Sequence, residues 1–450
     1  MLRKADCYYA EGRYAEAIDT YDRVAALDID DQDYALYQKA IAEGVIGKYE
    51  AKTKTLAQLV NKMPKSAYAD DAAYELANTY LILDNNQKAL RYFNIVINNY
   101  PNSSHLVKSM QKKGLTYYNT DNYDLALNTF KNIRKQYPGT KESKEALVSI
   151  RNIYTNINQL EKFFKYAKEN AITLTDSDRD STLFTAASNL YMDGDCEKAT
   201  TSLKKYLRQF PKGIFALNAH YYLADCYYRN GNMDQAASHY KLIADTSVTS
   251  YTEKSVLRLA KIYYENENYP QALTYYKKLE RISDFKNNKL EARKWIMRCQ
   301  FKLKNYEQAL IASRKLIQTD KASDEWINEA YMTIGKSSLK LDSTSTALAA
   351  FQYLTEQLQN EMAVEAKYRI AKIEYEQGNM KKSEDLLFEI INQVPSYDYW
   401  IAKSFILIAD IYTQRGNKAQ AKATLRSIID NYKVDPASER SNLVEIAQNK

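Results

Sequence analysis

Glycine and proline are scarce in this chain, with 11 glycines and 7 prolines among 450 residues. No stretch is rich in Gly, Ser or Pro, so the sequence contains nothing typical of a flexible linker and predicts a mostly helical protein. No run approaches eighteen consecutive apolar residues, so no membrane-spanning helix is expected. The opening Met1-Leu-Arg-Lys-Ala-Asp-Cys lacks the apolar core of a signal peptide.

Residues suited to catalysis or metal binding are also few. The chain has three histidines, His105, His220 and His239, and none has a metal-ligating partner three or four residues away. The phosphate-binding loop GxxxxGK[ST], the dinucleotide motif GxGxxG and the nucleophile motif GxSxG do not occur. We therefore expect a protein that is not an enzyme and that binds no cofactor or metal ion.

Internal repetition is what the chain has in abundance. Residues 217–243 form a pattern of two short amphipathic helices joined at Gly231, with Ala224 and Ala236 where the helices must pass close together. Positions equivalent to Ala236 recur at intervals of 35 to 38 residues, and a second small position usually precedes each by twelve residues. The positions equivalent to Ala236 are Ala17, Lys52, Ala89, Ala126, Phe163, Ala199, Ala272, Ala309, Ala347, Ser383 and Ala421.

Bulky residues and prolines follow these alanines at fixed distances. A Tyr, Phe or Leu usually lies four residues on, and a proline, which stops a helix, lies twelve residues on in five units. This order of positions resembles the tetratricopeptide repeat over nearly all of residues 1–432, in about twelve units with a period near 37. The resemblance extends loosely to cell-envelope repeat proteins of Bacteroides-type bacteria. The prolines are Pro64, Pro101, Pro138, Pro211 and Pro395.

The resemblance implies an all-α fold, a right-handed superhelical solenoid of stacked antiparallel helix pairs. Several units depart from the pattern, and one is degenerate, because Arg151 and Phe163 stand at both of its small positions; there the superhelix is expected to bend or loosen. Asp435-Pro436 is a favourable helix start near the end of the chain. The predicted division is 1–138 for units 1–4, 139–175 for the degenerate unit, 176–432 for units 6–12, and 433–450 for a C-terminal capping helix.

The four cysteines are expected to be free and buried. Cys7, Cys226 and Cys299 fall at one repeat position, on the buried side of the first helix of three different units. Their Cα atoms should therefore be too far apart to bridge. Cys196 replaces a packing aromatic, and buried thiols of this kind behave as small hydrophobic groups.

The first repeat suggests where the protein resides. If Ala5 is the first small position, its helix begins at or before Met1, so we expect the natural chain to extend further toward the N-terminus. A signal peptide could lie in that extension, which slightly favours a bacterial periplasm or cell envelope over the cytoplasm.

The family resemblance implies a concave groove lined by the first helix of each unit. In one column facing this groove, seven of twelve positions are aromatic, and tyrosine offers large contact area at low entropic cost. A neighbouring column turns basic toward the C-terminus and would form a positive stripe. The expected binding residues are Tyr191, Tyr221, Tyr228, Lys261, Tyr264, Arg298, Phe301, Lys302, Lys336, Lys340, Lys372 and Tyr375.

Each column has a second interpretation. The rings could pack between neighbouring helices and only stiffen the stack. Glu291, Glu329 and Glu365 recur seven residues before Arg298, Lys336 and Lys372. These acids could pair with cations of a neighbouring repeat and form a row of solvated ion pairs that contributes little to stability.

The pattern favours a non-catalytic scaffold or adaptor that holds a peptide or helix of a partner protein in the groove. The alternative is a helical-repeat module that binds a polyanion such as nucleic acid, or a glycan. A formal net charge of +7 and a pI near 8.8 fall short of a nucleic-acid-binding module, and no dense Lys/Arg run occurs, so nucleic acid is the less favoured partner.

Overall fold

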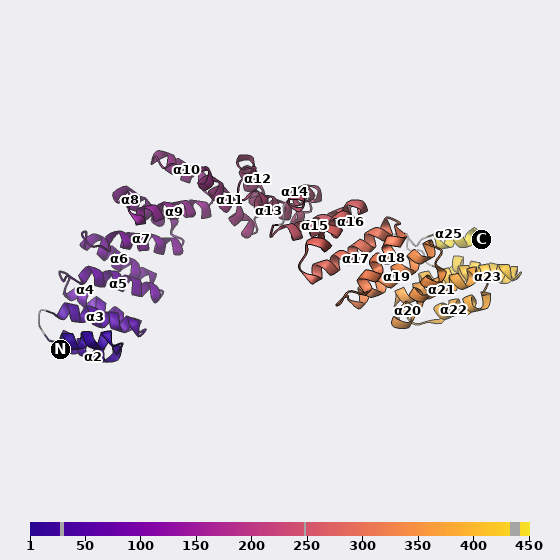
Figure 1. The fold of residues 1–450 in the computed structure, drawn as a ribbon, viewed down its shortest axis with the longest axis horizontal. Helices are drawn as coiled ribbons and strands as arrows, with labels where there is room; N and C mark the ends of the chain where they lie inside the picture. The colour runs from indigo at the N-terminus through magenta and orange to yellow at the C-terminus, as the bar shows by residue number, and fades with distance from the viewer. Residues whose placement is uncertain (28–30, 247–248, 433–441) are drawn as a thin grey trace. The chain divides into compact units, whose positions relative to one another are not determined.

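The computed structural model describes residues 1–27, 31–246, 249–432 and 442–450. These residues form α-helices joined by turns, and they contain no strand. The chain divides into two compact units, 1–215 and 216–450, and in each unit a helix packs against its neighbours in the sequence (Figure 1). The predicted all-α architecture of tandem helix pairs is confirmed.

The described residues of unit 1 form six helix pairs, and we call the first helix of each pair the A helix and the second the B helix. The helices are α1 Leu2–Ala10, α2 Tyr14–Ala25, α3 Gln32–Val45, α4 Tyr49–Lys62, α5 Ala69–Ile82, α6 Asn86–Asn99, α7 Leu106–Asn119, α8 Tyr123–Gln136, α9 Lys141–Asn156, α10 Leu160–Glu169, α11 Asp176–Met192 and α12 Cys196–Gln209.

The described residues of unit 2 form six further pairs and one short terminal helix. The helices are α13 Ala216–Arg229, α14 Met233–Asp245, α15 Thr252–Glu265, α16 Tyr269–Ile282, α17 Lys286–Lys302, α18 Tyr306–Ile317, α19 Asp324–Lys340, α20 Thr344–Gln357, α21 Glu361–Glu376, α22 Met380–Asn392, α23 Asp398–Gln414, α24 Lys418–Asn431 and α25 Leu443–Gln448.

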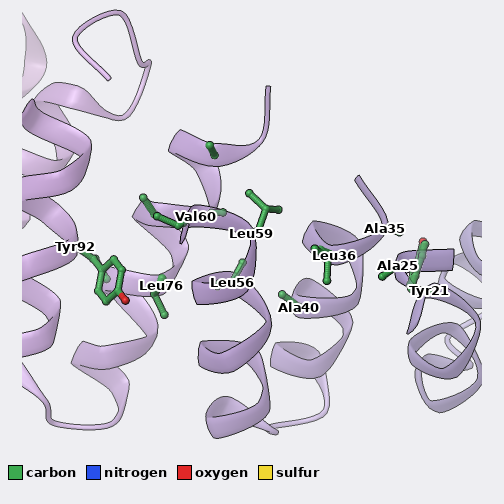
Figure 2. Close-up of a cluster of buried hydrophobic side chains, with 14 of the residues drawn as sticks. Tyr21, Ala25, Ala35, Leu36, Ala40, Leu56, Leu59, Val60, Leu76 and Tyr92 are labelled. Carbon is green, nitrogen blue, oxygen red and sulfur yellow. The ribbon is translucent and has the colours of Figure 1, made fainter. Parts of the chain in front are cut away.

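The small residues of the repeat lie in the cores of both units. Every alanine at the two repeated small positions is at most 4% exposed, so the spacing identified the buried faces correctly. Larger apolar side chains fill the space between successive helices, and Figure 2 shows Leu36, Leu56 and Leu76 on α3, α4 and α5. Because no helix can bury its apolar face alone, this shared core is what holds the stack together.

Two glycines show how tight the helix pairs are. A Cβ added at Gly335 of α19 would lie 2.3 Å from the ring of Phe351 in α20, and one at Gly114 would lie 2.8 Å from Phe130. Both phenylalanines are fully buried. At these positions the A helix therefore needs a residue without a side chain so that the B helix can place a ring against it.

A residue with positive φ lies two residues after the end of each A helix, always five residues before the alanine position of the B helix. Six of these residues are glycine, and the other six hold φ between 53° and 60° despite their side chains. The left-handed conformation lets a helix end and the chain reverse. The residues are Gly12, Gly47, Asp84, Asp121, Asn158, Gly194, Gly231, Glu267, Lys304, Asp342, Gly378 and Gly416.

Two units accommodate a charged residue at the alanine or small position. The stem of Lys52 lies against Gly44, and its ammonium group forms an ion pair with Glu75 at 2.7 Å. In the unit predicted to be degenerate, Arg151 is half-buried with its guanidinium 3.9 Å from Asp178. There α10 has only ten residues, and α9 also packs directly against α11. A bend at 139–175 and the predicted division of the chain stay predictions.

The expectation for the cysteines was wrong in two respects. Cys7 is exposed, because α1 is the first helix of its unit and packs against α2 on one side. Cys196 and Cys226 are disulfide-bonded, whereas Cys7 and Cys299 are free. Cys196 is the first residue of α12 and does not share the repeat position of the other three cysteines, so the separation of equivalent positions does not apply to it.

The last helix covers the end of unit 2. Helix α25 packs against α23 and α24, and it buries Leu443 and Ala447 beside Ala402 and Ile406. The predicted helix start at Asp435-Pro436 lies outside the described residues.

The contact between Gly335 and Phe351 can be tested by substitution. A glycine-to-alanine change inside a helix normally stabilises by about 1 kcal/mol. At Gly335 we expect the opposite, a loss of about 1–3 kcal/mol, because the buried ring has no room to move. Urea unfolding of Gly335→Ala would measure the loss. Combining it with Phe351→Leu should cost less than the two changes summed, and a more stable Gly335→Ala would contradict the packing described.

Candidate functional site

Two cavities lie side by side on the A helices of unit 2. The first, of about 530 Å³, is lined by side chains of α15, α17, α19 and α21. The second, of about 450 Å³, is lined by side chains of α17, α18, α19, α21 and α23. Phe301 and Lys336 line both, so the cavities adjoin. Together they form a recess that follows five consecutive repeats.

Seven of the twelve residues expected to bind a partner line this recess. Their convergence follows from the repeat, because equivalent positions of stacked A helices face the same side. The role of these residues in binding stays a prediction. The seven are Tyr264, Arg298, Phe301, Lys302, Lys336, Lys340 and Lys372.

Ion pairs between neighbouring repeats neutralise part of the basic column. Arg298 of α17 donates two hydrogen bonds to Glu329 of α19, at 2.6 and 2.7 Å. Lys336 of α19 lies 2.8 Å from Glu365 of α21, which Arg369 also contacts at 2.6 Å. The prediction that these acids pair with cations of a neighbouring repeat is therefore confirmed for Arg298 and Lys336.

The pKa values of these groups follow from the pairing. The hydrogen bonds to Glu329 raise the pKa of Arg298. Burial alone would raise the pKa of Glu365, but the charges of Lys336 and Arg369 outweigh burial and hold this pKa below its usual value. Arg298 and Glu365 are thus charged at neutral pH.

The aromatic residues of the first cavity pack on one another while they line it. The ring of Tyr264 meets Trp295 edge-on at 4.6 Å, and Trp295 stacks on Tyr276 at 5.7 Å. The Arg298 guanidinium lies 4.5 Å from the centre of the Trp295 ring. Burial raises the pKa of the Tyr264 hydroxyl, which therefore stays protonated. Packing between A helices thus accounts for part of the aromatic column.

The other five expected residues lie outside both cavities. Tyr221 stacks on Tyr251 at 4.4 Å, and the guanidinium of Arg258 covers Tyr228 at 4.5 Å. Lys261 pairs with Glu265 of its own helix at 3.8 Å. Tyr375 is half-buried beside the second cavity, and Tyr191 is half-buried in unit 1.

Several lining residues were not identified from the sequence. Trp295 belongs to the first cavity, and Trp400, Arg369 and Lys403 belong to the second. The chain has only three tryptophans, and two of them line the recess, so the rarity of this residue was a usable signal. Lys403 occupies the position of the recurring glutamate in its repeat. This change of charge could also have been recognised from the spacing of the glutamates.

No group of three or more His, Cys, Asp or Glu side chains that could hold a metal ion occurs among the described residues. No helix in the described part of the chain is both long and apolar enough to cross a membrane.

Comparison with known sequences identifies the family. Sequence models of the tetratricopeptide repeat match residues 1–33, 71–103, 108–140, 184–247, 254–281 and 399–433, which together make up about half of the chain. The chain is a tetratricopeptide repeat protein. The matched segments of this repeat protein include the helix pair α13–α14.

Three solved structures similar to this tetratricopeptide repeat protein are each 14% identical to it. Naa15/Naa10 bound to HypK-THB has a TM-score of 0.42, with 99% of this chain and 69% of that one covered. The P58(IPK) TPR domain has a TM-score of 0.24, with 93% and 97% covered. A tetratricopeptide repeat protein of Parabacteroides merdae has a TM-score of 0.26, with 67% and 98% covered. No curated protein matches the sequence.

The ion pairs of Glu365 predict a pH dependence. Because the pKa of Glu365 is lowered in the folded protein, its contribution to stability is present above the ordinary carboxyl pKa and is lost as the pH falls through the lowered value. We expect Glu365→Gln to lower the free energy of unfolding by about 1–3 kcal/mol at pH 7 and to flatten its decline below about pH 4.5. Urea unfolding at several pH values measures both effects.

Glu376→Gln is the matched control. Glu376 pairs with Lys372 at 3.7 Å, and both side chains are more than half exposed, so we expect a change below about 0.5 kcal/mol. Equal effects of the two variants would contradict the special position of Glu365.

Proposed function

We propose that this tetratricopeptide repeat protein is a non-catalytic scaffold that holds a peptide or helix of a partner protein in the recess on the A helices of unit 2. Repeats of this family form interaction scaffolds. The observation that carries the proposal is the pair of adjoining cavities that share Phe301 and Lys336. A continuous recess with apolar walls and charged edges suits a polypeptide segment.

The lining of the recess supports recognition rather than catalysis. Among the described residues that line the two cavities there is no His, Cys, Ser or Asp. Arg298 and Lys336 form ion pairs with Glu329 and Glu365, so these two cations already hold neighbouring helices together. The surface offers ring faces from Tyr264 and Phe301 together with hydrogen-bonding edges, a composition typical of binding sites.

The alternative of a polyanion partner is less favoured by the ion pairs. A nucleic acid is bound largely through many cationic side chains that each contact a phosphate group. In the first cavity Arg298, Lys302 and Lys336 are matched in number by Glu329, Glu361 and Glu365. This part of the recess therefore offers no excess of positive charge.

Phe301 provides the test of the proposed site. We expect Phe301→Ala to weaken binding of a captured partner by about 1–3 kcal/mol, roughly 5-fold to 150-fold in Kd, because this ring lines both cavities. The control is Leu242→Ala on α14, where an apolar side chain is 49% exposed outside the recess. Calorimetry with the purified partner would measure both affinities. Equal affinities of the two variants would place the partner elsewhere.

We also propose that the protein works in an oxidising compartment, such as a bacterial periplasm. Disulfides persist in such compartments and are rare in a reducing cytosol, and Cys196 and Cys226 are disulfide-bonded.

Counting thiols in protein isolated without reductant from its native cells tests the compartment. In denaturant we expect two alkylated cysteines before reduction, Cys7 and Cys299, and four after it. In the folded protein only Cys7 should react readily, because Cys299 is buried and burial raises its pKa to about 12. Four alkylated cysteines before reduction would contradict the proposal.

A further inference from the structure

The ion pairs of the recess follow a rule of position. In the A helices α17, α19 and α21, a cation lies one residue after the small position and a glutamate lies six residues before it. Arg298 and Lys336 each reach the glutamate of the next A helix, Glu329 and Glu365.

In α23 the two positions carry opposite charges. Lys403 takes the place of the glutamate, and Asp410 takes the place of the cation. Asp410 is bound by Lys450 at 2.5 Å. Lys372 of α21 would have met a glutamate on α23, and the residue at that position is a lysine instead.

The second cavity consequently has an excess of positive charge. Lys372 pairs with Glu376 of its own helix at 3.7 Å, and both side chains are more than half exposed. Lys340 is exposed and has no ion pair among the described residues. Even without Lys403, the cations Lys336, Lys340, Arg369 and Lys372 face only two carboxylates, Glu365 and Glu376.

The walls of this cavity are apolar and aromatic. Phe301, Leu339, Tyr368 and Trp400 line it together with the cations. The ammonium group of Lys403 lies 5.0 Å from the centre of the Tyr368 ring and 5.2 Å from that of Trp400. Trp400 is only 4% exposed, and its indole nitrogen donates to Glu361 at 3.2 Å, so the apolar surface open to a ligand comes mainly from the half-buried Phe301, Leu339 and Tyr368.

We infer that the second cavity recognises two neighbouring acidic side chains of a partner polypeptide, with a large apolar side chain beside them. This inference rests on the proposed scaffold function and specifies the partner's chemistry. The excess of two cations over carboxylates sets the number of acidic side chains at two. The aromatic lining of the cavity accepts the partner's apolar side chain. An internal acidic segment fits better than nucleic acid, because the positive excess is confined to this cavity and the neighbouring one is balanced.

Short peptides test the inference on the full chain. The probe is a fluorescent, C-terminally amidated peptide Gly-Ser-Glu-Glu-Leu-Ser-Gly, so that the side chains supply its carboxylates, and its partner has Gln-Gln in place of Glu-Glu. Fluorescence anisotropy should show at least tenfold tighter binding of the acidic peptide. Lys340→Glu/Lys372→Glu should abolish that preference, whereas Lys241→Glu on α14, which is also exposed, should leave it unchanged.

Several outcomes would overturn the acidic site. They are no binding of the acidic peptide up to about 1 mM, equal binding of both peptides, or tighter binding of a single-stranded oligonucleotide than of the acidic peptide. The same variants applied to the captured partner separate this inference from the scaffold function. Binding lost in Phe301→Ala but kept in Lys340→Glu/Lys372→Glu would preserve the scaffold and reject the acidic site.

Discussion

The close approach of two helices in each repeat is the constraint on which the structure depends. A buried ring such as Phe351 or Phe130 occupies the space that a side chain at Gly335 or Gly114 would need. Because the A helix must be small where the B helix is large, the same pair of positions recurs along the chain. That pairing sets the rotation of each helix, and the rotation decides which side chains reach the recess.

The charges of unit 2 show how a repeat can vary its surface without changing its core. Alternating cations and carboxylates on successive A helices join neighbouring repeats through Arg298–Glu329 and Lys336–Glu365. Exchanging the two signs in a single repeat, at Lys403 and Asp410, changes which side chains can neutralise one another. Lys403 and Asp410 are half-buried and lie outside the apolar core, so the exchange leaves the packing of that core unchanged. A single repeat can therefore acquire a different surface while the stack of repeats keeps the same core.

Much of the fold could be predicted because the repeat is a one-dimensional pattern. The interval between Ala224 and Ala236 predicted one helix pair, and its recurrence predicted the others. Helices α4, α6, α8 and α12 end two residues before Pro64, Pro101, Pro138 and Pro211, as proline requires. The positive φ values of Asp84, Glu267 and Lys304 were not foreseen, since half of these turns use residues other than glycine.

The candidate site was predictable in part for the same reason. The columns brought Tyr264, Phe301 and Lys336 together correctly, because equivalent positions of stacked helices face one side. Whether a cation is paired depends on the neighbouring helix, and the sequence left two interpretations open until Glu329 and Glu365 were located. The disulfide bonding of Cys196 was missed, because comparing residues at one repeat position overlooks residues at other positions.

Packing between neighbours in the sequence also determines how the units would respond to tension. Since each helix pair is held mainly by the pairs before and after it, a pulling force can detach one pair while the next stays folded. Each detached pair would release a repeat of about 37 residues, which is roughly 120–130 Å of extended chain. A unit of this kind behaves as a series of small extensible links rather than as a single rigid body.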